Sequence, residues 1–216
     1  MDRSARRRDM AYRAATRILA VALLPLALLA APRRTSSRRT SSRRTSSRRT
    51  SSRRASPGLA RARLLACRWA LAARFPAEDL VGLTQPTRAA FEAARGTALW
   101  RDGEVIGLTD GYRDEREQRR LFAEMVRRTG SVQVARCRVL PPHESRHIAG
   151  TALDVRPVEG ARWLERHGWR YHLYRTYDNE WWHFEYWPDR RPLRLPHPGM
   201  DASMAAGVRM TARDRG

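Results

Sequence analysis

The sequence predicts an α+β fold, with a small antiparallel sheet, flanking helices and a disordered, arginine-rich segment before them. Three observations support this prediction. Helix-like stretches are mixed with short strand-like runs, these runs are not adjacent in the chain, and a repetitive segment without apolar residues precedes them. The 216 residues are enough for one domain with a core and some additional segments.

The positive charge of the chain is concentrated near its N-terminus. The formal net charge is +21, from 43 basic and 22 acidic residues, which by itself suggests a nucleic-acid-binding protein. However, residues 1–74 hold 20 of the basic residues and only two acids, Asp2 and Asp9. Residues 75–216 hold the other 23 basic and 20 acidic residues, so the part that can fold is close to neutral. We therefore expect no nucleic-acid partner.

Residues 1–31 are typical of an export signal. Several arginines precede an apolar run from Ile18 to Ala31, which is short for a transmembrane helix and contains Pro25. These features favour a signal peptide. A signal anchor is the alternative, because no clear cleavage site follows and the next residues are again rich in arginine. We expect a secreted or envelope-associated protein that contacts a membrane only through this segment.

A tandem repeat forms the predicted linker, residues 32–58. The unit RRTSS occurs four times from Arg33 to Ser52 and is followed by a degraded copy. Such a segment has no apolar residues to bury and should be disordered. Identical copies favour a recent duplication without a function, whereas an electrostatic tether to anionic wall polymers is the functional alternative.

The remaining chain divides into three parts. A helix is expected over Leu59–Phe75, within an N-terminal helical segment of residues 59–79. The folded domain is expected at residues 80–190, and an irregular tail at residues 191–216.

Within the domain, local patterns predict helices and short strands. Asp102-Gly103 lies between two short apolar runs, a signal for a β-hairpin. Asp114 can cap a helix that runs to about Arg128, with Glu117 completing a capping box, and Gly168 can close a later helix. The other expected elements are the helices Thr87–Arg95 and Gly160–His167 and the strands Thr151–Val155 and Trp182–Tyr186.

The chain has two cysteines, Cys67 and Cys137. Two thiols cannot form a four-cysteine zinc site. In an exported protein they could form a disulfide between the N-terminal helix and the domain, and the alternative is two unrelated thiols.

Reactive residues are concentrated in the stretch SRHIAGTALD, from Ser145 to Asp154. His147 can offer an imidazole nitrogen to a metal ion, and Gly150 permits a turn after it. In the strand that follows, Ala152 and Asp154 point to the same face, and the small Ala152 leaves room for a metal beside the carboxylate.

A second cluster, NEWWH, ends at His183, which would be the third ligand. Three protein ligands with a fourth position open to water are typical of catalytic zinc. Bound zinc brings the pKa of its water towards neutrality and polarises a scissile carbonyl. Glu180 is then the candidate general base, and Arg113 the candidate cation for the developing oxyanion.

The two patterns, S-x-H-x-x-G-x-A-x-D followed by E-x-W-H, resemble those of the zinc D-alanyl-D-alanine carboxypeptidases and dipeptidases of the VanY/VanX type. These enzymes share a fold core with lysostaphin-like endopeptidases and the hedgehog signalling domain. An upstream segment, G-Y-R-x-x-x-x-Q at residues 111–118, resembles a third motif of the family. The likeness covers about half of the chain, roughly from Leu80 to Trp187.

The resemblance implies a role for each matched residue. The small sheet would carry a site for one Zn²⁺ ion, and the substrate would be a stem peptide of bacterial peptidoglycan. We expect the protein to act as a monomer. The implied zinc ligands are His147, Asp154 and His183, the catalytic residues Glu180 and Arg113, and the substrate contacts Ser145, Gln118, Tyr112 and Trp182.

The expected reaction is release of a C-terminal D-alanine by attack of a zinc-bound water. The segment between Asp154 and Glu180 is short and lacks the long insertion that resembles a dipeptidase's pocket closure, which favours a carboxypeptidase with an open cleft. A D-Ala-D-Ala dipeptidase and a murein endopeptidase are the alternatives. From other classes, a zinc-fold binding protein without turnover and a nucleic-acid binder acting through the arginine tract remain.

Overall fold

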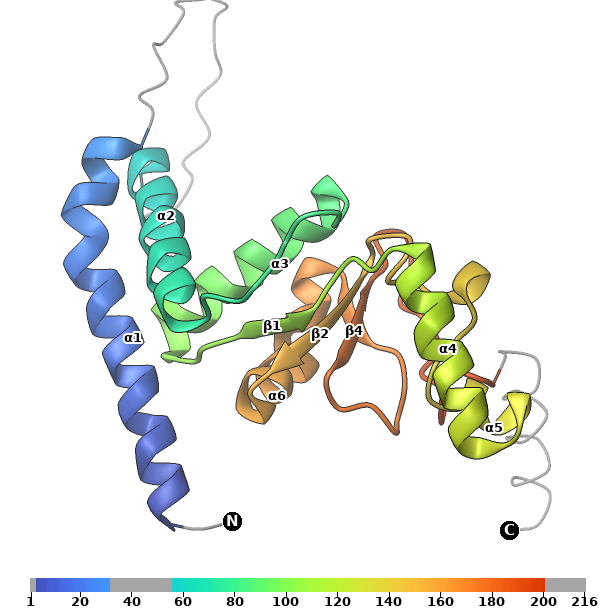
Figure 1. Cartoon of the computed structure of the whole chain (residues 1–216). Helices are drawn as coiled ribbons and strands as arrows, with labels where there is room; N and C mark the ends of the chain where they lie inside the picture. Colours follow the sequence, from blue (N-terminus) through green and yellow to red (C-terminus); the bar gives the residue numbers. More distant parts are fainter. Residues whose placement is uncertain (1–2, 32–55, 201–216) are drawn as a thin grey trace, which may run out of the picture.

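The structure is a computed structural model that describes residues 3–31 and 56–200. The RRTSS repeat and most of the linker around it lie outside these ranges, as do residues 201–216 of the predicted tail. The described part contains helices and one small sheet, and it confirms the α+β class (Figure 1).

The sheet has four strands in the order β1-β2-β4-β3, and every neighbouring pair is antiparallel. Two of the strands, β2 and β4, correspond to the two predicted from the sequence. The strands are β1 (Gly107–Asp110), β2 (Ala152–Arg156), β3 (Leu173–Arg175) and β4 (His183–Tyr186).

One face of the sheet holds the hydrophobic core. Leu153 of β2 and Phe184 of β4 are paired residues and point into this core, where they join Phe91, Trp163 and Leu164. These three come from α3 (Gln85–Thr97) and α6 (Val158–His167), which cover that face. Because side chains alternate along a strand, the neighbouring residues of β2 and β4 point to the opposite face.

The other described helical elements are short or lie at the ends of the molecule. Asp114 caps α4 (Glu115–Thr129) as predicted, by accepting a hydrogen bond from the Glu117 amide at 2.8 Å. The Glu117 carboxylate binds Arg120 and does not complete a capping box. These elements are α1 (Arg3–Ala30), α2 (Pro57–Arg74), the π-helical turn η1 (Ala98–Asp102), α4 (Glu115–Thr129), α5 (Val132–Arg136) and the 3₁₀ turns η2 (Pro142–Glu144) and η3 (Gly168–Tyr171).

The predicted hairpin at Asp102-Gly103 is wrong. Residues of this segment continue α3 through the η1 turn, and Gly103 ends the turn with φ 70°, donating its amide to the Ala98 carbonyl. The Asp102 carboxylate accepts a hydrogen bond from the Trp163 indole at 2.7 Å. A glycine with positive φ suits a helix end as well as a hairpin turn, and here tertiary packing selects the helix end.

Gly168 closes α6 as predicted, with its amide donating a hydrogen bond to the Leu164 carbonyl. Its φ is −59°, so the helix continues into η3, and the left-handed residue is His172 at the end of that turn. Close packing requires glycine at position 168, since a Cβ there would lie 2.6 Å from the Leu173 carbonyl oxygen.

The N-terminal helix α1 packs along α2 at one end of the molecule (Figure 1). Ala20 and Ala27 are fully buried in this contact, and Arg13 binds both carboxylate oxygens of Glu104 at 2.8 and 2.7 Å. The stretch Asp9–Ala30, of 22 residues, is long and apolar enough to cross a membrane, as a signal sequence near the N-terminus can also be. The helix α1 thus extends well before the apolar run Ile18–Ala31 that the sequence analysis compared with a transmembrane helix.

Cys67 and Cys137 are both free thiols in the structure, so no disulfide joins α2 to the domain.

Candidate metal centre and active site

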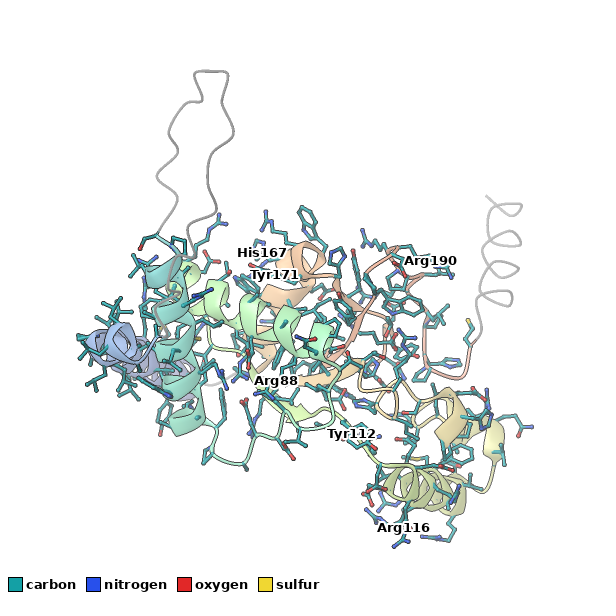
Figure 2. The ribbon with its side chains drawn as sticks, turned by 90° about the horizontal axis from the view of Figure 1, so that it is seen from above. Arg88, Tyr112, Arg116, His167, Tyr171 and Arg190 are labelled. Atoms are coloured by element: carbon teal, nitrogen blue, oxygen red, sulfur yellow. The ribbon has the colours of Figure 1, made fainter. Side chains whose placement is uncertain are left out.

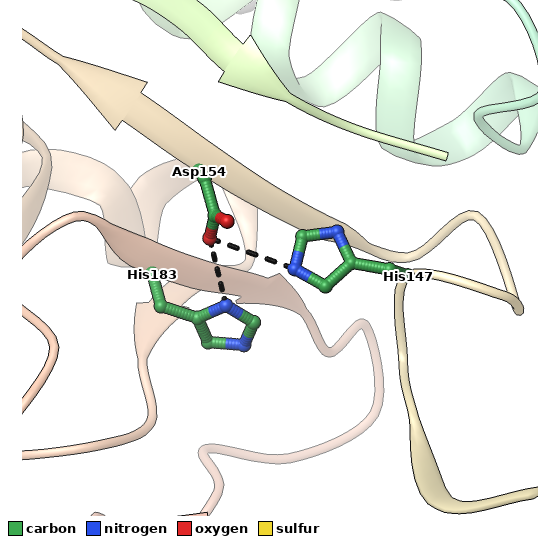
Figure 3. Close-up of side chains that lie close together, drawn as sticks. All are labelled: His147, Asp154 and His183. Atoms are coloured by element: carbon green, nitrogen blue, oxygen red, sulfur yellow. Dashed lines mark hydrogen bonds and ion pairs between the residues drawn. The ribbon is translucent and has the colours of Figure 1, made fainter. Parts of the chain in front are cut away.

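Three side chains that could bind a metal ion meet on the face of the sheet opposite the core (Figure 3). Asp154 Oδ1 lies 2.9 Å from Nδ1 of His183 and 3.5 Å from Nε2 of His147. One donor atom from each residue lies within 4.8 Å of the other two. Among the described residues this is the one such group of three or more.

The two spacings from Asp154 are compatible with a tetrahedral ion. Two ligands that each lie about 2.0–2.2 Å from zinc are roughly 3.3 Å apart in a tetrahedron. The distances of 2.9 and 3.5 Å from Asp154 lie on either side of this value. Two imidazoles and one carboxylate also form a donor set that suits Zn²⁺, so these residues fit a metal with a fourth position left for another ligand.

The fold explains why these three residues meet. Asp154 and His183 are directly paired across β2 and β4, so their side chains share one face. His147 precedes β2 in a turn where the Gly150 amide donates to the His147 carbonyl at 3.1 Å. Gly150 has φ 64°, and a Cβ there would clash with the backbone of the Gly82–Thr84 segment, which confirms that this position requires glycine.

Each histidine is oriented through the ring nitrogen that faces away from the other donors. Nδ1 of His147 lies 2.6 Å from the Gly111 carbonyl oxygen, which can only accept a hydrogen bond, so Nε2 of His147 is left for a metal. For His183 the arrangement is reversed, because Nε2 lies 3.1 Å from Glu185 Oε1 and Nδ1 faces Asp154. Such outer partners set which nitrogen of a histidine binds a metal.

The charges of the cluster are strongly coupled. Burial by itself would raise the pKa of Asp154, but hydrogen bonds and charge from His147 and His183 outweigh it and lower this pKa. Burial would lower the pKa of His183, yet its hydrogen bonds to Asp154 and Glu185 raise it to about 10. The positive charge of His183 and the negative charges of Asp154 and Glu185 therefore stabilise each other in this buried site.

Glu180 is a buried carboxylate at the edge of this cluster. Its Oε2 lies 3.9 Å from Nδ1 of His183, and no described residue donates a hydrogen bond to its side chain. Burial raises the pKa of Glu180 to about 7, while the positive charge of His183 opposes this shift. A carboxylate with a pKa near neutrality can both accept and return a proton.

Arg113 is held in place from two sides. Its guanidinium binds Asp110 through Nε, at 3.1 Å, and through Nη2, and its Nη1 donates to Gln118 Oε1 at 2.5 Å. Gln118 is 1% exposed, and its amide nitrogen donates to the Leu140 carbonyl at 2.6 Å. Both polar atoms of the Gln118 side chain thus have hydrogen-bond partners within the protein, and one of these partners is Arg113.

A cavity of about 160 Å³ joins these groups. Ser145 and Trp182 lie in its wall, as do His147, Asp154 and His183. Tyr112 does not line this cavity. It lies on the connection between β1 and α4, is 43% exposed, and packs its ring over Gly82 (Figure 2). The structure thus brings eight of the nine residues singled out from the sequence to one cavity and leaves Tyr112 outside.

Two residues of the site were not found from the sequence. Glu185 contacts His183 as described above, and Tyr177 stacks on the His183 ring with centroids 5.1 Å apart. The position of Glu185, two residues after His183 on a strand, would have placed both side chains on one face. For Tyr177, no local pattern marks the contact.

No protein-family profile matches the sequence, and no curated protein matches it. Among solved structures, the chain is similar to the vancomycin resistance D,D-pentapeptidase VanY from a VanB-type cassette in complex with Zn(II), with 23% identity over 50% of this chain and 76% of that one and a TM-score of 0.45. It is similar to the LD-carboxypeptidase LdcB, with 20% identity over 48% of this chain and 58% of that one and a TM-score of 0.44. It is also similar to DacB from Streptococcus pneumoniae D39, with 23% identity over 50% of this chain and 67% of that one and a TM-score of 0.42. These solved structures include the VanY group whose motifs the sequence resembles.

Proposed function

We propose that this protein is a zinc-dependent peptidase of the bacterial cell envelope that releases the C-terminal D-alanine from peptidoglycan stem peptides. One observation carries the proposal: the buried cluster of His147, Asp154 and His183 shares a cavity with an uncoordinated carboxylate and a fixed arginine. A binding site for a structural metal would need neither of the last two groups.

His147 Nε2, Asp154 Oδ1 and His183 Nδ1 would hold one Zn²⁺ ion. When bound at such a site, zinc makes a water molecule more acidic and polarises a carbonyl group. The three donors come from a turn and from two paired strands, so their positions are set by the sheet itself. Three ligands are the number that a catalytic zinc site uses, since structural sites are closed by four.

Glu180 would move the proton. Its carboxylate takes a proton from the attacking water and delivers it to the nitrogen of the leaving D-alanine, so that water is added across the peptide bond and the carboxylate is restored. A pKa of about 7, raised by burial, suits this double role near neutral pH.

Arg113 would stabilise the negative charge that develops on the carbonyl oxygen. Three of its five N–H donors are used by Asp110 and Gln118, which leaves the others for the cavity that it lines. Because the guanidinium is fixed before the substrate arrives, little reorganisation is needed when charge develops. Gln118 would act through Arg113, and Ser145 and Trp182 would contact the peptide.

The sequence motifs support the choice of substrate, because they resemble those of D-alanyl-D-alanine peptidases in three separate segments. The small cavity beside the metal donors also suits a terminal alanine better than a bulky side chain. The catalytic unit would be residues 80–190, acting as a monomer outside the cytoplasm, with membrane contact through residues 1–31.

Hydrolysis by the purified full-length protein tests this function. We expect D-alanine release from a muramyl pentapeptide, loss of release on chelation, and recovery with Zn²⁺. Free D-Ala-D-Ala and cross-linked peptidoglycan are the comparison substrates, and preferential cleavage of either would replace the carboxypeptidase by a dipeptidase or an endopeptidase. His147→Ala should abolish release, whereas His143→Ala, at an exposed histidine nearby, should not. Zinc-independent release, or none from any substrate with zinc bound, would contradict the proposal.

A further inference from the structure

Glu185 lies behind His183, on the side away from the other metal donors. The two residues are separated by one position on β4, so their side chains point to the same face of the sheet. Glu185 Oε1 accepts a hydrogen bond from Nε2 of His183 at 3.1 Å, and Tyr177 stacks on the same ring. The imidazole of His183 is therefore held by a hydrogen bond at Nε2 and by stacking on one face of the ring.

The surroundings of Glu185 are built for a carboxylate. The residue is 2% exposed, and its second oxygen, Oε2, accepts a hydrogen bond from the Trp187 indole at 2.7 Å. Arg146 Nε lies 3.5 Å from the same oxygen, and the Arg146 guanidinium stacks over the Trp187 ring at 4.1 Å. A buried carboxylate with a cation and donors for both oxygens is one that the fold keeps charged.

The two histidines of the cluster need opposite ring nitrogens for the metal. His147 uses Nε2, because its Nδ1 donates to the backbone oxygen of Gly111. With a metal at Nδ1 of His183, the remaining ring proton is on Nε2, where Glu185 accepts it. A carboxylate at this position both fixes the tautomer and makes the ligating nitrogen more basic.

We propose that Glu185 is a positioning residue that fixes Nδ1 of His183 as the metal ligand and strengthens metal binding, with Trp187 and Arg146 holding the carboxylate in place. This inference rests on the metal site of the proposed function, but it concerns binding of the ion and not hydrolysis.

Zinc affinity of the full-length protein, measured by competition with a chromophoric chelator at fixed pH, tests this role. Glu185→Leu should bind zinc about 10–100-fold more weakly, the usual cost of removing such a partner. Glu185→Gln, which keeps an acceptor of the same size without the charge, should lose less. Glu117→Gln, at an exposed carboxylate of α4, is the matched control and should bind as the parent does.

Nitrogen NMR of the zinc-loaded protein, with labelled histidine, gives a second readout. The parent should show His183 protonated at Nε2 and shifted by the metal at Nδ1, and Glu185→Leu should show a second form or loss of this pattern. Parent-like affinity together with a parent-like spectrum in that variant would overturn the proposal. If Glu185→Leu does not fold, as judged by circular dichroism, Trp187→Phe takes its place, since it removes the donor to Glu185 and keeps an aromatic ring next to the Arg146 guanidinium. Unchanged zinc affinity in a folded Trp187→Phe and in Glu185→Gln would equally overturn the role.

The two proposals fail in different ways. A protein that binds zinc with His183 in the expected tautomer but hydrolyses no peptide contradicts the proposed function and leaves Glu185 in its role. A protein that hydrolyses pentapeptide with zinc while Glu185→Leu retains full affinity contradicts only the role of Glu185.

Discussion

Asp154 and His183 face each other directly across the β2–β4 pair, with Oδ1 of the first 2.9 Å from Nδ1 of the second. Strand register thus sets the distance between two donors that are 29 residues apart in the chain. An antiparallel pairing shifted by one residue would turn one of the side chains into the core.

This pairing predicts the effect of Asp154→Asn. The amide has the same shape but no charge, so the cluster should lose most of its affinity for zinc while the sheet stays folded. We expect at least a tenfold weaker zinc affinity by titration calorimetry. Asp189→Asn, at an exposed aspartate, is the control. Zinc binding at the parent's strength by Asp154→Asn would remove Asp154 from the ligand set.

Glu180→Gln should separate metal binding from turnover. The side chain keeps its size but cannot take a proton, so kcat for pentapeptide should fall by about 10²–10⁴ while bound zinc remains stoichiometric. Turnover and metal content are to be measured on the same samples. Loss of the metal would show that Glu180 supports the ion, and undiminished turnover would place the base elsewhere.

Arg113 and Gln118 should behave as one unit. Arg113→Ala should lower kcat by about 10²-fold or more, the usual size of a lost oxyanion donor. Gln118→Leu should lower it less, because it leaves the guanidinium with Asp110 alone. In the double variant the two effects should be clearly less than additive, as a double-mutant cycle of kcat/KM will show. Full additivity would indicate that Gln118 contacts the substrate independently of Arg113.

Gly150→Ala should destabilise the protein by about 2 kcal/mol or more, since alanine is strained at φ 64° and its Cβ would meet the Gly82–Thr84 backbone. Gly58→Ala is the matched control. Gly58 lies in the first turn of α2 with open space around it, so alanine there should be neutral or stabilise by up to about 1 kcal/mol. Urea unfolding of both variants provides the comparison, and equal stabilities would contradict the geometry of the turn.

The two thiols should differ in reactivity. Burial raises the pKa of Cys67 to about 12, so at pH 8 only on the order of one molecule in ten thousand carries the thiolate. A thiol reagent should therefore modify the native protein at Cys137, which is partly exposed, and reach Cys67 only after denaturation. Cys137→Ser should abolish the native signal. Rapid labelling of Cys67 in the folded chain would show that α2 and α1 do not pack as described.

Part of the candidate ligand set could be recognised from the sequence because its spacing is local. His147, Gly150 and Asp154 lie within eight residues, and their turn and strand follow from a glycine and an alternating pattern. What brings His183 to them is the pairing of β2 with β4, which no short stretch of sequence contains. The sequence offered His183 as a third ligand through its residue type and its neighbour Glu180, and the resemblance to a known family implied the same role.

Other features were missed for physical reasons. Asp102-Gly103 fits a hairpin and a helix end equally well, and only the contact of Asp102 with Trp163 decides between them. β3 has three residues, too few for an alternating pattern to be recognised. Glu185 looks like any acidic residue until the strand direction shows that it stands behind His183.

The packing of α1 on α2 has a consequence for export. A protease that removed the N-terminal helix would uncover Ala62 and Ala66, which are fully buried in the intact chain, and would leave Glu104 without its hydrogen bonds from Arg13. The mature chain would then differ from its precursor by a newly exposed strip of alanines and an unmatched acid. Such cleavage would therefore alter both the exposed apolar area and the charge of the surface that remains.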